Sequence, residues 1–537
     1  MTLQSMRGLL LKLLTLGVML VLFAPTSGAA DEPKRGGTLV YVLGGAPQSL
    51  NRSLSVVHFD AVAASPAMEG LIRVERHTGK IQPVLAAKWS ISKDGLTYVF
   101  NLRKGVTWHD GKPYTAEDVV FTFKKMLPFH PASSGLLARM KSVKALDNFT
   151  VEITLTEPFA PLLISLTEEN VAIQPKHVFE GKDIVTNPAN LAPVGTGPFK
   201  FASFNAGESV EFVRNDNYWD QPKPYLDRIV FQVIPDKSSQ VRALQSGDVD
   251  LINAFTLDLA AVAGLKGDKS VRLDPGRDPA VEMAMLFYNT LRPPLNDPRV
   301  RQALLMALDR EFIVRSAYSG HAVVGPSAVP SRFGWAHDGS VNLGKMYPYD
   351  LKAAASLLDE AGLPADANGK RLSLEFLYRS DNQGALALAD IIRSSWGQIG
   401  VNVTLAGRES AVWKEKFFKT RSYDVSYATY TSRKDPELGV ARVYRCEKDK
   451  TRSWTNPTGY CNPKADALWK AAATATDLGE RGQLYSKVQR ILAEDISTVL
   501  LAELIQYDAV NVKVRGFDKF NQGASSEVLW EELYFKD

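Results

Sequence analysis

Hydrophobic and polar residues alternate most regularly between residues 96 and 103. Leu96, Tyr98, Phe100 and Leu102 would point to one side of an extended chain, and the residues between them to the other. Lys93-Asp94-Gly95, directly before this segment, has the composition of a tight turn. The pattern therefore predicts a half-buried strand that follows a hairpin turn.

A capped helix is predicted shortly after this strand. Residues 109–113 form a second turn, and Thr115 is placed to cap a helix. Asp118 lies three residues later, where its carboxylate can accept a hydrogen bond from the backbone of the capping residue. The apolar run of residues 119–121 then gives the helix a face to bury.

Strands and helices continue to alternate further along the chain. Residues 36–42 and 229–234 read as buried strands. Asp297-Pro298 and Asp350 each precede apolar residues at helical spacing, so each marks the start of a helix. This order of elements is typical of α/β proteins.

The length of the chain indicates more than one lobe. It has 537 residues, and 45% of them are hydrophobic, an ordinary fraction for a folded protein. A chain of this length exceeds what one core normally supports, so at least two lobes are expected. No repeat or Gly/Ser-rich linker interrupts the sequence. We therefore expect interleaved lobes rather than lobes arranged one after another.

The N-terminus has the pattern of an export signal. Arg7 and Lys12 precede an apolar segment at residues 13–23, and small residues follow at 27–30. We expect residues 1–30 to be a signal peptide, cleaved near Ala29/Ala30, and the mature protein to lie in the periplasm. Loss of Arg7 and Lys12 lowers the net charge from +4 to +2. Such a small charge gives no reason to expect nucleic acid as a partner.

Taken together, residues 86–123 closely resemble the signature of the family 5 extracellular solute-binding proteins. These are the dipeptide-, oligopeptide- and nickel-binding partners of ABC importers. The resemblance covers nearly the whole mature chain and includes residues 193–199, 215–219, 247–250, 287–290, 297–303 and 458–463.

The resemblance implies an α/β fold of the large periplasmic binding protein type. Two lobes would be joined by two hinge crossings, near residues 283–289 and 501–507, with an extra domain inserted in the first lobe. The implied divisions are residues 31–57, 189–283 and 505–537 for lobe I, 58–188 for the inserted domain, and 284–504 for lobe II.

The chain has two cysteines, Cys446 and Cys461, on either side of a short polar loop. The expected compartment permits disulfides, and two thiols without a nearby histidine are a poor metal site. We therefore expect a disulfide between them. Dipeptide-binding relatives carry cysteines at comparable positions.

No motif for catalysis is visible. The sequence lacks a Gly-x-Ser-x-Gly elbow, a His-Glu-x-x-His motif, a P-loop and a Gly-x-Gly-x-x-Gly loop. The seven histidines are scattered without ligand spacing. His109-Asp110 belongs to the family signature, and no nucleophile accompanies it. We expect no enzyme activity, no cofactor and no metal site.

Arg379 is the main candidate for binding a ligand. It follows the strand-like segment 372–376 and lies beside Tyr378 and Asp381. Dipeptide-binding relatives have an arginine that grips a carboxylate in the corresponding loop, and Arg379 matches it. A guanidinium suits this role because it forms two parallel hydrogen bonds with a carboxylate. A solvated surface arginine is the alternative interpretation.

A second candidate loop follows the strand-like segment 423–428. Aligning Asp435-Pro436 with the Asp-Pro of peptide-binding relatives puts Ser432 where their amine-binding aspartate would stand. Arg433 and Lys434 add positive charge, which would repel an ammonium group unless Asp435, Asp381 or Glu437 turns inward. Tyr430 and Tyr378 are candidates for the walls of the site.

The resemblance implies a periplasmic binding protein that closes its lobes around a solute and delivers it to an ABC permease in the inner membrane. The leading ligand class is a short peptide or a peptide-like carboxylate. An opine, an oligosaccharide or chelated nickel is an alternative ligand, and a periplasmic chaperone or sensor-adaptor is an alternative role. A monomer is expected.

Overall fold

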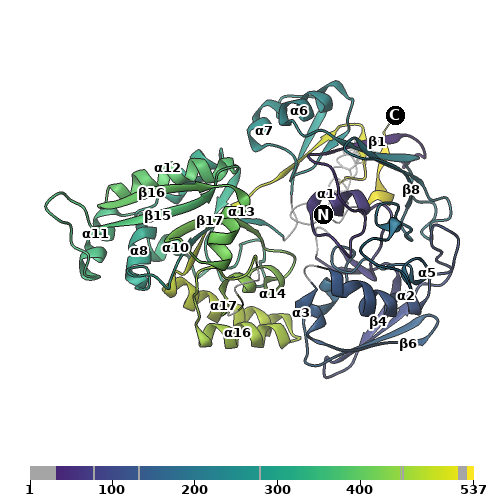
Figure 1. Ribbon diagram of the computed structural model, residues 1–537, viewed down its shortest axis with the longest axis horizontal. Coiled ribbons are helices and arrows are strands. Elements are labelled where there is room, and N and C mark those ends of the chain that lie inside the picture. Colours follow the sequence, from purple (N-terminus) through teal and green to yellow (C-terminus); the bar gives the residue numbers. More distant parts are fainter. Residues whose placement is uncertain are drawn as a thin grey trace, which may run out of the picture.

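Two lobes are evident in Figure 1, with both the early and the final described segments in one lobe and the middle of the chain in the other. The computed structural model describes residues 32–75, 79–130, 133–276, 280–447, 449, 453–517 and 529–536. The predicted signal peptide lies outside these residues. Within the described part, no helix is long and apolar enough to cross a membrane.

Lobe I contains a seven-stranded sheet in the order β12-β19-β11-β1-β10-β9-β8. Strand β1 pairs in parallel with β10 and β11, and the outer pairs are antiparallel. Its strands are β1 (Thr38–Leu43), β8 (Phe199–Asn205), β9 (Ser209–Arg214), β10 (Arg228–Val233), β11 (Leu251–Ile252), β12 (Val271–Pro275) and β19 (Tyr507–Asn511). A further short pair, β20 (Val514–Arg515) and β21 (Tyr534–Phe535), lies near the C-terminus.

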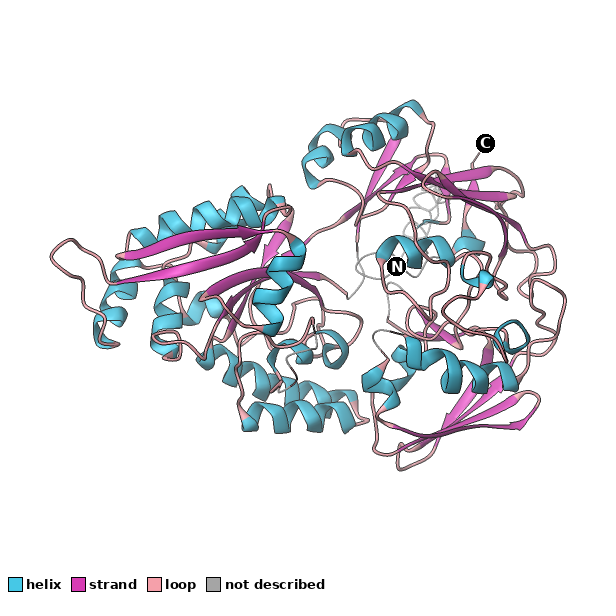
Figure 2. Cartoon of the chain, in the orientation of Figure 1, coloured by secondary structure: helices cyan, strands magenta, loops and turns pink. Residues whose placement is uncertain are grey.

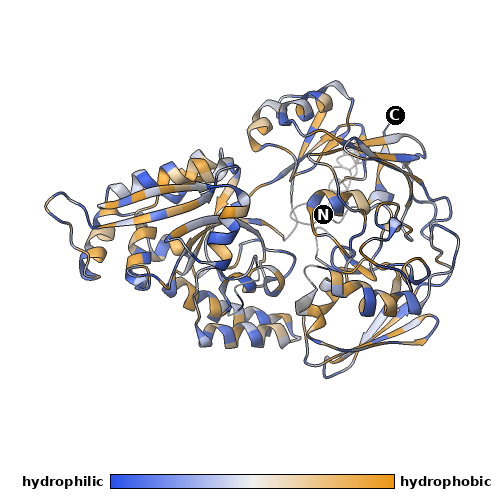
Figure 3. Cartoon of the chain, in the orientation of Figure 1, coloured by the Kyte–Doolittle hydropathy of each residue, from blue (hydrophilic) through white to orange (hydrophobic). Residues whose placement is uncertain are grey.

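Lobe II contains a six-stranded sheet in the order β14-β18-β13-β17-β15-β16. Helices lie on both sides of it (Figure 2). Its strands are β13 (Glu282–Tyr288), β14 (Ala322–Val324), β15 (Leu372–Arg379), β16 (Val401–Arg408), β17 (Val425–Thr431) and β18 (Thr498–Leu504). All residues of β13 after Glu282 are buried. The outer loop that follows α11 (Leu351–Glu360), at the far left of Figure 3, is mostly hydrophilic.

The inserted domain is built on a four-stranded antiparallel sheet in the order β4-β5-β7-β6. Its strands are β4 (Ala86–Ile91), β5 (Thr97–Leu102), β6 (Met140–Asp147) and β7 (Thr150–Leu155), with β2 (Ile72–Val74) and β3 (Ile81–Pro83) as a separate pair. Tyr98, Phe100 and Leu102 are buried in its core, as their alternation predicts. The predicted capping box is also present, because the backbone N–H of Thr115 donates to the Asp118 carboxylate at 2.9 Å.

The α-helices follow the same division. Lobe I has α1 (His58–Ala64), α6 (Lys237–Ser246) and α7 (Leu259–Leu265), and the inserted domain has α2 (Ala116–Phe121), α3 (Ser134–Leu137), α4 (Leu162–Ser165) and α5 (Lys176–Phe179). Lobe II has α8 (Pro298–Met306), α9 (Arg310–Ala317), α10 (Leu343–Met346), α11 (Leu351–Glu360), α12 (Gln383–Gly397), α13 (Ser410–Lys414), α14 (Pro436–Gly439), α15 (Ala441–Tyr444), α16 (Pro463–Thr474) and α17 (Leu478–Asp495). Asp297 and Asp350 cap α8 and α11, as their sequence patterns predict.

The two connections between the main sheets lie close to the expected hinge crossings, but the first comes earlier in the chain. Strand β12 ends at Pro275 and β13 begins at Glu282, so this crossing lies within residues 276–281. Met283, expected in lobe I, is already part of the lobe II sheet. The second crossing, residues 505–506, joins β18 to β19.

The start of the inserted domain also differs from the expected residue 58. Helix α1 begins there, but Val62, Ala63 and Ala64 pack into the core of the lobe I sheet. The separate core of the inserted domain begins with Leu71. We therefore assign α1 to lobe I.

Asp118 ties α2 to two other segments, so its removal should destabilise the protein. The buried carboxylate accepts hydrogen bonds from the backbone of Thr115 and of Lys176, both at 2.9 Å. Asp118→Ala leaves these donors unpaired and should lower the free energy of unfolding by about 3 kcal/mol in chemical denaturation. Glu117→Ala is the control, since its exposed ion pair with Lys176 contributes less than about 1 kcal/mol. Equal losses in the two variants would contradict this role of Asp118.

Candidate functional site

A cavity of about 320 Å³ lies where lobe I, the inserted domain and lobe II meet. It is lined by Arg52, Val56, His58, Ala61 and Phe255 of lobe I, His130, Glu169 and Asn170 of the inserted domain, and Glu282, Thr429, Tyr430, Thr431, Arg433, Arg442 and Trp454 of lobe II. A solute in this cavity would contact all three parts of the molecule.

The lobe I wall is built on segments that follow parallel strands. Phe255 comes three residues after β11, and His58 begins α1 in the connection that follows β1. The rings of His58 and Phe255 lie against each other with their centres 4.3 Å apart. The Asn253 side chain is within hydrogen-bonding distance of both His58 and the Tyr41 hydroxyl, which fixes this wall to the sheet. Ligands of open α/β sheets commonly bind beyond the carboxyl ends of the strands.

The two histidines of the cavity are uncharged at neutral pH. Burial, helped by the nearby charge of Arg52, lowers the pKa of His58 to about 4. Burial also lowers the pKa of His130 to about 4, with smaller effects from Arg52 and Arg433. The charge of the cavity wall is therefore set by its arginines and glutamates.

The lobe II wall lies at the end of β17 and the start of β13. Arg442 is held beneath it, because its guanidinium donates to the carbonyl oxygens of Gly439 and Thr431, both at 3.1 Å. Burial, and secondly the charge of Arg433, lowers the pKa of Arg442 to about 9, so it stays protonated. Burial raises the pKa of Glu282, while a hydrogen bond with Thr429 and the charge of Arg442 oppose this rise.

The predicted disulfide between Cys446 and Cys461 is confirmed, and it closes the loop that carries Trp454. The adjacent Thr455 carbonyl accepts a hydrogen bond of 3.0 Å from the Tyr430 hydroxyl. The Trp454 and Tyr430 rings meet edge to face, 5.5 Å apart. The disulfide loop thus places an aromatic side chain on the cavity wall.

Three of the predicted site residues lie at or beside this wall. Tyr430 lines the cavity. Ser432 is fully buried, and its hydroxyl accepts a hydrogen bond of 2.9 Å from the backbone of Val281. Asp435 is also buried, where it caps α14 and pairs with Arg481 at 2.9 Å. Both Ser432 and Asp435 therefore use their polar groups within the protein.

The other three predicted residues lie apart from the cavity lining, at the end of β15. Arg379 donates two hydrogen bonds to Asp381, of 3.0 and 2.7 Å, and 34% of its side chain is exposed. Tyr378 is buried and lies against Gly407 and Phe376. None of these three described residues lines the cavity. The role predicted for Arg379 stays a prediction, and an arriving carboxylate would have to compete with Asp381.

None of the lobe I and inserted-domain lining was predicted from the sequence. Phe255 could have been found, because Gly247-Asp248 is a turn signal and the strand-like residues that follow it end at Ile252, three residues before Phe255. His130, Glu169 and Asn170 carried no such signal, since they lie in loops far along the chain from the lining residues of the two lobes. In the described part of the chain, no group of three or more His, Cys, Asp or Glu side chains is placed to hold a metal ion.

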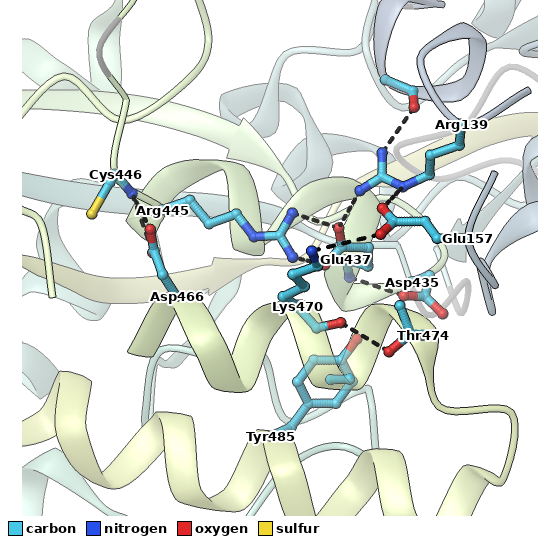
Figure 4. A network of polar contacts seen from close by, with 12 residues as sticks. Arg139, Glu157, Asp435, Glu437, Arg445, Cys446, Asp466, Lys470, Thr474 and Tyr485 are labelled. Atoms are coloured by element: carbon cyan, nitrogen blue, oxygen red, sulfur yellow. Dashed lines mark hydrogen bonds and ion pairs between the residues drawn. The ribbon is translucent and has the colours of Figure 1, made fainter. Parts of the chain in front are cut away.

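A second set of residues joins the inserted domain to lobe II outside the cavity, and Figure 4 shows its polar part. We call this set the interlobe contact: Arg139, Glu157 and Ala160 of the inserted domain, and Glu437, Leu438, Lys470 and Ala473 of lobe II. Glu437 binds Arg445 of its own lobe at 2.7 Å and approaches Arg139 at 3.9 Å. Glu157 lies 3.7 Å from Arg139 and 3.6 Å from Lys470.

The interlobe contact also has a backbone hydrogen bond and an apolar part. The Ala160 N–H donates to the Ala473 carbonyl at 2.8 Å. Half-buried Leu438, from α14 of lobe II, packs against the core of the inserted domain. The described structure is therefore an arrangement in which the inserted domain and lobe II touch beside the cavity.

Comparison with known proteins assigns the chain to a family. The profile of the bacterial extracellular solute-binding proteins, family 5 Middle, matches residues 80–450. The chain belongs to this family. The resemblance stated from the signature residues is thus confirmed, and so is the α/β, two-lobed fold that it implied.

The relatives bind different solutes. The dipeptide-binding protein of Escherichia coli (strain K12) is 29% identical over 532 residues, which cover 94% of this chain and 95% of that protein. The ABC transporter-associated periplasmic binding protein DppA from Helicobacter pylori, in complex with the peptide STSA, is 26% identical with a TM-score of 0.77, covering 94% and 99% of the two chains. AgaA from A. tumefacien R10, in complex with agropinic acid, is 25% identical with a TM-score of 0.76, covering 93% and 99%.

Removing the disulfide should affect both stability and ligand binding in this solute-binding protein. The bridge spans 15 residues, so replacing both cysteines by serine should lower the free energy of unfolding by about 3 kcal/mol. Because the loop carries Trp454, affinity for a solute should fall too. Chemical denaturation and calorimetric titration of the double variant test this, with reduced wild-type protein as the control. Lower stability with unchanged affinity would show that Trp454 is held without the bridge.

Weakening the interlobe contact should reduce affinity without unfolding either lobe. Across the junction, Arg139→Ala with Leu438→Ala removes the long ion pair with Glu437 and one apolar contact. This loss should destabilise the closed form by about 1 kcal/mol, which corresponds to about a fivefold rise in Kd. Titration measures the affinity, and small-angle scattering measures the opening of the lobes. Arg393→Ala with Leu478→Ala is the matched control, because both residues are exposed and lie within lobe II. Equal Kd values for the two double variants would argue against a role in closure.

Proposed function

We propose that this family 5 solute-binding protein is the periplasmic receptor of an ABC importer. It takes a short peptide or a peptide-like carboxylate into the cavity, closes its lobes around it, and delivers it to the permease in the inner membrane. The observation that carries this proposal is that lobe I, the inserted domain and lobe II all line one cavity. A solute that binds all three stabilises the closed arrangement over the open one.

The residues that line the cavity suit a small solute with a carboxylate group. The cavity volume of about 320 Å³ is at the lower end of the range for small-molecule sites. Arginine side chains offer paired donors for a carboxylate, and aromatic rings from both lobes offer apolar walls. This combination suits a solute with one charged end and an apolar body.

We place the mature protein in the periplasm, after cleavage of the signal peptide near Ala29/Ala30. It acts as a monomer that binds and releases its solute without chemical change, and it uses neither a cofactor nor nucleic acid. The family consists of solute-binding proteins, which supports a role without catalysis.

An opine-type acid is the second candidate ligand. The similarity to a protein solved with agropinic acid favours it, since that protein has the same fold and a comparable identity to this chain. The wall of arginines and aromatic rings would also suit such an acid.

A thermal-shift screen of the mature protein tests the proposal. The panel contains di- to pentapeptides, opines, oligosaccharides and nickel chelates, and calorimetric titration follows for each compound that raises the melting temperature. A solute at about 100 times its Kd should stabilise the protein by about 2.7 kcal/mol. We expect shifts from peptides or peptide-like carboxylates. Shifts from sugars or nickel chelates alone would keep the receptor role and reject the proposed ligand class.

A further inference from the structure

Two residues on the lobe II wall of the cavity have a backbone conformation that residues other than glycine rarely adopt. Among the residues that the structure describes, five other than glycine have positive φ: Ser319, Arg421, Arg433, Trp454 and Ile496. Arg433, at 53°, and Trp454, at 63°, both line the cavity. Such conformations carry a free-energy cost and gather at functional sites, where the surroundings hold them.

Arg433 is held from both sides. The preceding Ser432 is buried, accepts a hydrogen bond from the backbone of Val281, and donates one of 3.2 Å to the Arg433 carbonyl. On the other side, Asp435 is fixed by Arg481 and by its cap on α14. The backbone at Arg433 therefore has little freedom to turn away from the cavity.

The Arg433 guanidinium has no hydrogen-bond or ion-pair partner among the residues that the structure describes. No acid that the structure describes forms an ion pair with it, whereas Arg52, on the opposite wall, pairs with Glu168 at 2.8 Å. Arg442 is also engaged, by two carbonyl oxygens and the nearby charge of Glu282. Of the three arginines that line the cavity, Arg433 is the one whose guanidinium neither donates a hydrogen bond nor forms an ion pair within the described structure.

Trp454 gives the same wall an apolar surface. Its ring packs against Tyr430 and Phe418, both with centres 5.5 Å away, and remains half-buried. Phe255 of lobe I lines the same cavity and is 38% exposed. Exposed aromatic surface on two walls favours a ligand that covers it.

We propose that Arg433 binds the carboxylate of the solute and that Trp454 packs against its apolar side chain. The ligand class is then a carboxylate with an apolar group, and Arg433 rather than Arg379 is the residue that selects for the carboxylate. A partnerless guanidinium can form two charge-assisted hydrogen bonds with an incoming carboxylate. This inference rests on the proposed function, because it concerns the same cavity.

The test compares variants of the full mature protein by native mass spectrometry and titration. The probe is a library of di- to tetrapeptides and opine acids, each as the free acid and as the primary amide. Wild type should bind members of the acid library and not their amides. For the tightest acid found, Arg433→Gln should raise the Kd at least 30-fold, and Arg433→Lys should recover part of the loss.

Two further variants separate binding from folding. Arg433→Gly suits the positive φ, so its melting temperature should be no lower than that of wild type, while its affinity falls as in Arg433→Gln. Arg379→Gln is the matched control, an arginine of the same lobe already paired with Asp381, and its Kd should stay within threefold of wild type. Trp454→Ala should reduce the preference for acids with Leu or Phe side chains over those with Gly, and Trp454→Phe should retain it.

The possible failures are distinguishable. If wild type binds no member of the library, the proposed ligand class is rejected, and this inference with it. If wild type binds an acid and Arg433→Gln stays within threefold, the proposed function stands and the role of Arg433 is overturned. A loss in Arg379→Gln alone would assign the carboxylate to Arg379. Unchanged side-chain preference in Trp454→Ala would remove Trp454 from the site.

Discussion

The register of β13 in the lobe II sheet is the constraint on which the site depends. Glu282, its first residue, lies opposite Thr431 at the end of β17 and opposite Leu504 at the end of β18. One strand therefore brings the first hinge crossing, the second crossing and the loop that carries Arg433 to the same edge of the sheet. Both faces of β13 are buried, one against a core that includes Leu286 and the other against a core that includes Phe287. A shift of one residue would exchange the side chains between these two cores, so their packing fixes the position of the cavity wall.

A buried ion pair fixes the loop beyond that edge. Asp435 and Arg481 are both nearly inaccessible, and Arg481 also donates to the Tyr485 hydroxyl at 3.0 Å. Breaking such a pair leaves an uncompensated buried charge, at a cost of about 3–5 kcal/mol. The loop between β17 and α14 is thus rigid at its acidic end, and Asp435 is held away from any role as a mobile ligand group. This explains how a strained Arg433 can persist.

Local patterns explain why much of the fold could be predicted from the sequence and much of the site could not. The alternation in β5 and the caps at Thr115, Asp297 and Asp350 depend on neighbouring residues, so they are readable without a structure. The cavity instead joins residues as distant as 52 and 454. The pairing of Arg379 with Asp381, two residues away, was a local signal against a free guanidinium. The orientation of Arg433 follows from a φ angle and a buried Ser432, which composition does not reveal.

The inserted domain contacts lobe II as well as lining the cavity. It supplies Glu169 to the cavity and receives Leu438 of lobe II against its own core. The ion pairs across this junction are long, at 3.6 to 3.9 Å, and such pairs contribute at most about 1 kcal/mol each. With the one backbone hydrogen bond and the half-buried Leu438, they make a small contact that is not expected to hold the lobes together by itself. In the proposed function, the remaining free energy of closure comes from a solute that touches both lobes, so closure would depend on occupancy.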